Sequence, residues 1–157
     1  MRVIENSDEM ATIGLPQVTQ LGFVVRSLNQ WIERYNPLFG PFTTMDAKLT
    51  DVGYRDGKAD CELKLAFGKS GDIEIEFIEW VSGHSPHREF IEQGREGLHH
   101  LQFHVRNIEP WIEKLTSIGY RTIWYQRLAS DTAFVYMEKT SDPTFIEFVE
   151  IPPHPAA

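Results

Sequence analysis

The sequence predicts an α+β fold in which two βαβββ modules form one curved mixed sheet, with the helices outside and a concave cup inside. Three observations support this prediction. The segment QLGFVVRSLNQWIE, which starts at Gln20, returns as HLQFHVRNIEPWIE from His100, with seven of fourteen positions identical. The strand pattern IEFIE at 75–79 returns as IEFVE at 146–150. In both copies strand-like alternation changes to helical spacing, and a single module would leave one sheet face uncovered.

The first module, assigned to residues 16–83, opens with a strand and a helix. Alternation from Gln20 places Leu21, Phe23 and Val25 on one strand face. Ser27 is the expected helix N-cap, and Pro37 and Gly40 are expected to end the helix. Further strands are predicted at Asp60–Phe67 and Ile73–Glu79, after a longer region at Gly40–Asp60.

The second module, assigned to residues 97–152, repeats this plan. Asn107 is the expected N-cap of its helix and Gly119 the expected stop. Its later strands are predicted at Thr132–Glu138 and Thr144–Glu150. A linker helix at 84–95 separates the modules, with a Ser-Pro start at its N-terminus. Residues 1–157 are therefore expected to form a single domain.

The composition limits the classes of partner. The net charge is −8 and no basic block occurs, so nucleic acid is not an expected partner. A single cysteine, the absence of a signal-like N-terminus and the lack of a long apolar run favour a cytoplasmic protein without a membrane partner.

The strand face away from the helices carries four polar residues that the repeat pairs with one another. Gln20 corresponds to His100, and Glu76 corresponds to Glu147. Buried carboxylates need a positive partner, and this mixed oxygen and nitrogen set suits one divalent ion such as Zn, Co, Ni, Mn or Fe. His99 is expected on the helix side as a structural histidine. The candidate substrate-lining residues are Val24, Gln102, His104, Phe145 and Val149.

The chain resembles the vicinal oxygen chelate superfamily, which contains glyoxalases, bleomycin-resistance proteins and dioxygenases. The segments GREGLHHLQFHV, IEFIEWVSGHSP and TFIEFVEIP are most similar to the methylmalonyl-CoA epimerase branch. That resemblance implies paired βαβββ modules around a metal cup, often in a homodimer, with His100, Glu76 and Glu147 as metal ligands. The epimerase pattern has histidine where this chain has Gln20. Eukaryotic-type glyoxalase I is similar here instead, using Gln, Glu, His and Glu in that order.

The function implied by this resemblance is a metal-dependent isomerase that moves an α-proton on a small acyl thioester, as in methylmalonyl-CoA epimerase. Glu147 is the expected general base. Asp56 is the nearest counterpart of a first-module acid, and Glu62 is the other option. Two alternatives remain: a glyoxalase I-type lyase that isomerises a glutathione hemithioacetal, and a metal-free protein that binds a small molecule or confers resistance. Gln20 argues against an extradiol dioxygenase.

Overall fold

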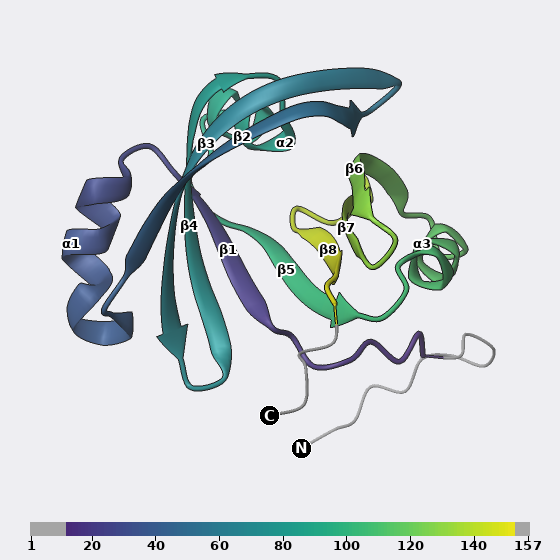
Figure 1. The fold of residues 1–157 in the computed structure, drawn as a ribbon, viewed down its shortest axis with the longest axis horizontal. Helices are drawn as coiled ribbons and strands as arrows, with labels where there is room; N and C mark the ends of the chain where they lie inside the picture. The colour runs from purple at the N-terminus through teal and green to yellow at the C-terminus, as the bar shows by residue number, and fades with distance from the viewer. Residues whose placement is uncertain (1–11, 153–157) are drawn as a thin grey trace.

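The computed structural model describes residues 12–152 and contains one mixed sheet that curves into a closed barrel (Figure 1). The first module consists of β1 (Gln20–Val25), α1 (Leu28–Phe39), β2 (Thr43–Tyr54), β3 (Gly57–Ser70) and β4 (Ile73–Gly83). The linker helix is α2 (Pro86–Glu92). The second module consists of β5 (Gly97–Val105), α3 (Glu109–Thr116), β6 (Arg121–Ala129), β7 (Thr132–Glu138) and β8 (Phe145–Glu150). The predicted fold class is confirmed.

The strand order around the barrel is β1-β4-β3-β2-β6-β7-β8-β5. Each repeated first strand pairs in parallel with the last strand of its own module, β1 with β4 and β5 with β8. The two first strands also pair with each other, antiparallel. This arrangement brings the heads of the two repeats together in the barrel wall. On the opposite side, the β2–β6 ladder is short and contains the pairs Gly53–Tyr125 and Tyr54–Trp124. Next to it, the backbone N–H of Arg55 donates to the carbonyl of Ile123 at 2.8 Å.

The helix boundaries agree with the sequence prediction in part. Ser27 caps α1 as expected, since its side chain accepts a hydrogen bond from the backbone N–H of Gln30. However, α1 continues through Pro37 to Phe39, so that the prediction of Pro37 as a stop is wrong. Asn107 is also wrong as a cap: Ile108 occupies the N-cap position of α3, which has no side-chain cap of its own.

The region at Gly40–Asp60 accounts for the difference in length between the modules. It forms β2, the turn after it and the start of β3, which is longer than predicted at both ends. Most of β2 is exposed, with only a few apolar side chains such as Ala47 and Leu49 facing inward, so its alternation is too weak to predict a strand from sequence. Within residues 12–152, no helix is long and apolar enough to cross a membrane.

Candidate metal and ligand site

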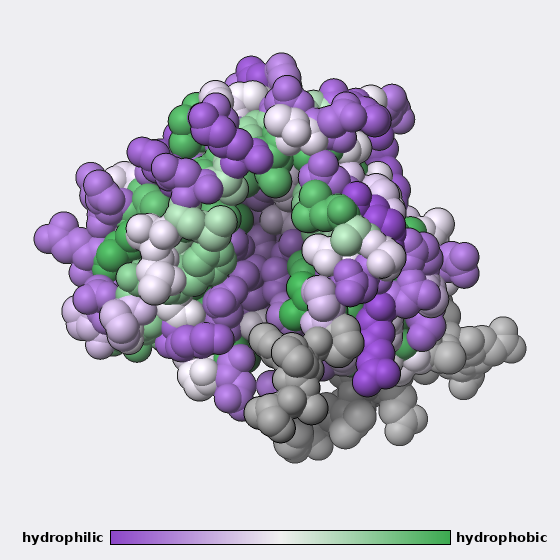
Figure 2. Space-filling view, in the orientation of Figure 1, coloured by the Kyte–Doolittle hydropathy of each residue, from purple (hydrophilic) through white to green (hydrophobic). Residues whose placement is uncertain are grey.

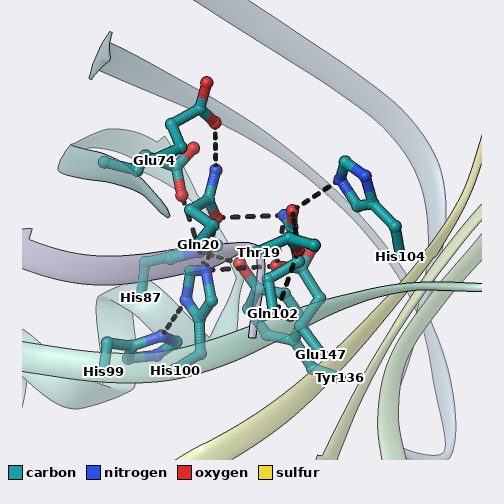
Figure 3. A network of polar contacts seen from close by, with 11 residues as sticks. Thr19, Gln20, Glu74, His87, His99, His100, Gln102, His104, Tyr136 and Glu147 are labelled. Carbon is teal, nitrogen blue, oxygen red and sulfur yellow. Dashed lines mark hydrogen bonds and ion pairs between the residues drawn. The ribbon is translucent and has the colours of Figure 1, made fainter. Parts of the chain in front are cut away.

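The four predicted ligands converge inside the barrel, where β1, β4, β5 and β8 lie next to one another. Figure 3 shows three of them, Gln20, His100 and Glu147. The Nε2 atom of His100 lies 3.1 Å from Gln20 Oε1, 3.1 Å from Glu147 Oε2 and 3.4 Å from Glu76 Oε2. All four side chains are buried. The structure therefore joins residues from the first and the last strand of the chain into one polar cluster.

A glycine makes room for the imidazole ring. Gly22 stands opposite His100 in the β1–β5 pair, two residues after Gln20 on the same strand face. A Cβ atom at Gly22 would lie 2.0 Å from Cε1 of His100, which is far inside the contact distance. The sequence alone gives Gly22 no role, because only the strand register shows which residue lies across from it.

Amide groups hold the cluster in place. The Gln20 side chain donates through Nε2 to Glu74 Oε1 at 2.7 Å, which leaves its Oε1 directed at His100. Gln102 donates through Nε2 to both Gln20 Oε1 at 3.0 Å and Glu147 Oε2 at 2.9 Å. These bonds fix the oxygen atoms that would face a cation, as second-layer hydrogen bonds do in metal sites.

His99 is buried and faces a helix, as expected, and this helix is the linker α2. A register shift in the β1–β5 pair follows the Gly22–His100 position, and the His99 ring packs against Phe90 of α2 and Phe145 of β8. Its Nδ1 atom lies 3.1 Å from Nδ1 of His100. Since Nε2 of His100 faces the carboxylates, its Nδ1–H is free to donate to His99, which fixes the ring and the tautomer. The adjacent HH pair was the sequence signal for this contact.

The electrostatics of the cluster favour a positive charge. Burial raises the pKa of Glu76. Burial also opposes protonation of His100, but the carboxylates of Glu147 and Glu76 outweigh it and raise the His100 pKa to about 9. Within residues 12–152, no Lys or Arg side chain forms an ion pair with either carboxylate. A positive charge at this position, carried by a protonated His100 or by a bound cation, would be stabilised by both carboxylates.

A divalent ion fits this donor set, although the side chains are not arranged around one. Within the described part of the chain, no group of three or more His, Cys, Asp or Glu side chains has the geometry of a formed metal site. The contacts of 3.1 to 3.4 Å from His100 Nε2 nevertheless match the distance of about 2.9–3.4 Å between two ligands whose metal bonds are about 2.1 Å long. An amide oxygen, an imidazole nitrogen and two carboxylates also suit such an ion chemically.

A cavity of about 250 Å³ lies over the cluster and includes Glu76, Gln102 and Glu147 in its lining. Two of the predicted lining residues, Gln102 and Val149, line it. Figure 2 shows this face of the molecule hollowed near its centre.

The other predicted residues lie elsewhere. Val24 is fully buried in the core and does not line the cavity. Phe145 starts β8 and lines a separate pocket beside α2. His104 is exposed and reaches the site only through Gln102 Oε1, at 3.0 Å from its Nε2. Asp56 lies in the exposed turn between β2 and β3, and Glu62 pairs with Lys48 at the surface.

A sequence profile of the glyoxalase/bleomycin resistance protein/dioxygenase superfamily matches residues 19–136. Among curated proteins, none matches the chain. A hypothetical protein from Bacillus halodurans is similar in structure, with a TM-score of 0.65 and 21% identity over 90% of this chain and 98% of its own.

Two epimerases are also similar in fold. The methylmalonyl-CoA epimerase of Mycobacterium tuberculosis has a TM-score of 0.63 at 19% identity, over 92% of this chain and 94% of its own. A variant of the Streptomyces coelicolor enzyme in complex with 2-nitronate-propionyl-CoA has a TM-score of 0.62 at 17% identity, over 88% of this chain and 100% of its own.

Proposed function

Because this chain belongs to the glyoxalase/bleomycin resistance protein/dioxygenase superfamily, we propose that it is a metal-dependent isomerase acting on a small acyl thioester. The reaction moves a proton on the carbon next to the thioester carbonyl. The single observation that carries this proposal is the buried cluster in which Gln20, Glu76 and Glu147 surround Nε2 of His100 at the end of a cavity. The thioester class comes from the similarity in fold to the epimerases, one of which is described with methylmalonyl-CoA.

In this proposal Gln20, Glu76, His100 and Glu147 hold the ion. A divalent cation supplies a Lewis acid that stabilises negative charge on a carbonyl oxygen. Glu147 lines the cavity, so its carboxylate is placed to remove and return the α-proton of a bound thioester. The Gln102 amide, which donates to Glu147, keeps the carboxylate oriented. A role for Asp56 stays a prediction, since this residue lies in an exposed turn.

The test is hydrogen exchange in D₂O over a panel of acyl-CoA thioesters with metal-loaded protein. Exchange of the α-hydrogen is expected with at least one thioester. Glu147→Gln should lower its rate by about 10²–10⁴-fold, the usual contribution of a general base. Metal content is measured in parallel, because the glutamine amide can still serve as a ligand. Glu33→Gln, at an exposed position on α1, should exchange like the unchanged protein. Metal-loaded protein that exchanges no thioester would overturn the proposal.

A glyoxalase I-type lyase is the second candidate, and one observation favours it. The Gln20 amide directs its oxygen at His100 while its nitrogen is held by Glu74, so that glutamine is preset as an oxygen ligand. Turnover of methylglyoxal with glutathione tests this candidate. A metal content below about 0.1 ion per chain that added metal does not restore would favour a metal-free binding protein over both enzymes.

A further inference from the structure

We propose that the cavity selects substrates whose acyl group is apolar and larger than methyl, and that it discriminates against a second carboxylate. This inference deepens the proposed function and takes the reaction from it. Selection by the cavity walls can be measured by binding alone, whereas the proposed reaction has to be measured by turnover.

The cavity walls are built from apolar side chains of both modules. Strands β2 and β3 form one side, and β6, β7 and β8 form the other. Figure 2 shows hydrophobic residues on both sides of the hollow. Two aromatic rings of the second module stand next to each other in the wall, with 4.7 Å between their centroids. The main apolar wall residues are Leu49, Leu63, Leu65, Trp124, Phe134 and Val149.

The charges in and around the cavity leave no partner for a second anion. Among residues 12–152, no Lys or Arg lines the cavity. Arg127 contacts a lining residue, Glu150, but its guanidinium is already shared between Glu150 and Glu109. A divalent ion would be neutralised by the carboxylates of Glu76 and Glu147. A carboxylate pushed against the walls would therefore lose its water without gaining a cation.

The size of the cavity favours a larger group than methyl. A methyl substituent would leave most of the 250 Å³ without contact to the ligand, and unfilled apolar space forfeits attraction from its lining. Each methylene that a ligand buries is worth about a fourfold gain in affinity. The affinity should thus rise with the length of the apolar group until the cavity is full.

The binding experiment uses simple acids as probes on the full, Zn- or Co-loaded chain. Calorimetry compares acetate, butyrate, hexanoate and adipate, the last being hexanoate with a second carboxylate. Affinity is expected to rise by about fourfold per methylene from acetate to hexanoate, and adipate should bind at least about tenfold more weakly than hexanoate. Affinity that does not depend on length, or adipate that binds as well as hexanoate, would overturn the inference.

A pair of variants tests whether the walls cause this selection. Leu49→Arg places a cation in the wall, and it should reduce or reverse the preference for hexanoate over adipate. Met45→Arg is the matched control, because Met45 lies on the same strand but is half exposed and does not line the cavity. It should keep the original preference. An unchanged preference in folded Leu49→Arg protein would count against the walls as the selector.

The exchange assay separates this inference from the proposed function. Length-dependent binding of the acids without exchange of any thioester would leave the inference standing and remove the isomerase. If methylmalonyl-CoA is the one thioester that exchanges and adipate binds tightly, the isomerase stands and the inference on selectivity is overturned. If the chain retains no metal, methyl hexanoate and monomethyl adipate replace the acids, and the same preference for the apolar ester is expected.

Discussion

Gly22 and His99 determine the geometry of the polar cluster at the scale of single residues. Neither belongs to the predicted ligand set. Gly22 provides the space that the His100 ring fills, and His99 contacts the ring nitrogen that points away from the carboxylates. Both act on His100, the residue whose Nε2 lies within 3.4 Å of the other three candidate ligands. Substitutions at these two positions therefore test the site without removing a ligand.

Gly22→Ala should displace the imidazole of His100, because the added methyl group would overlap with the ring. We expect metal affinity to fall by at least about tenfold and the free energy of unfolding to fall by about 1–3 kcal/mol. Metal titration and urea unfolding measure the two effects. Gly57→Ala is the control, since a Cβ there meets nothing within 4 Å. Equal metal affinity in the Gly22 variant would show that the ring position is not needed.

His99→Phe keeps the ring volume but removes the hydrogen-bond partner of His100 Nδ1. Metal affinity is expected to fall by about 10–100-fold, as when the second-layer partner of a histidine ligand is lost. Competition with a chelator provides the measurement, and circular dichroism checks the fold. His84→Phe, at an exposed position, should leave the affinity unchanged. A His99 variant that binds metal normally would contradict this role.

At the scale of elements, the last strand of each module anchors the first turn of that module's helix. The carboxylate of Glu79 on β4 accepts a hydrogen bond from the backbone N–H of Leu28 at 2.7 Å. The carboxylate of Glu150 on β8 accepts one from Ile108 at 3.2 Å. These glutamates are the final letters of the repeated IEFIE and IEFVE segments. An acidic side chain from another strand thus serves at a helix N-terminus, where it also complements the helix dipole.

Glu79→Ala should lower the free energy of unfolding by about 1 kcal/mol, which is typical for the loss of a helix cap. Urea unfolding monitored by circular dichroism measures it. Glu62→Ala provides the comparison, because the Lys48–Glu62 pair is exposed and should contribute less than about 0.5 kcal/mol. If both variants lose the same amount, the contact with Leu28 does not stabilise α1.

For the whole molecule, the shortest strand pairing in the barrel is the one between β2 and β6, which has two ladder pairs. Arg55, in the turn after β2, connects three parts of the chain at this junction. Its guanidinium lies 2.6 Å from Glu89 of α2 and 2.7 Å from Glu138 of β7. Tyr54 also donates a hydrogen bond to Glu89. This group supplements a short stretch of backbone pairing with side-chain contacts.

Arg55→Met should lower the free energy of unfolding by about 1 kcal/mol near neutral pH, a value kept small because the side chain is one-third exposed. Burial opposes ionisation of Glu89, but its bonds with Arg55 and Tyr54 outweigh burial and lower its pKa. This stabilisation is therefore present above the unfolded pKa of about 4.3 and is lost as the pH falls through the lower folded pKa.

Urea unfolding at about pH 7 and pH 3.5 tests this prediction, and the difference between Arg55→Met and the unchanged chain should shrink at the lower pH. Lys48→Met is the control, and it should lie close to the unchanged protein at both values. A difference that grows on acidification would refute the sign of the effect.

The duplicated segments by themselves determined the fold class and the four candidate ligands. Strand alternation has a fixed period of two, so a repeat places Gln20 with His100 and Glu76 with Glu147 on equivalent faces. Strand register was not predictable in the same way, because it depends on pairing between distant segments. The register placed Gly22 against His100, and it set His99 against the linker helix α2.

Only the tertiary structure decided which residues surround the cavity. Val24 and Phe145 share the predicted face but lie at other depths in the barrel, so neither lines the cavity over the cluster. The apolar residues that β2 contributes to the cavity wall were not predicted, because most of this strand is exposed and its alternation is weak. A periodic pattern specifies the direction of a side chain, whereas its depth and neighbours depend on how the sheet curves and closes.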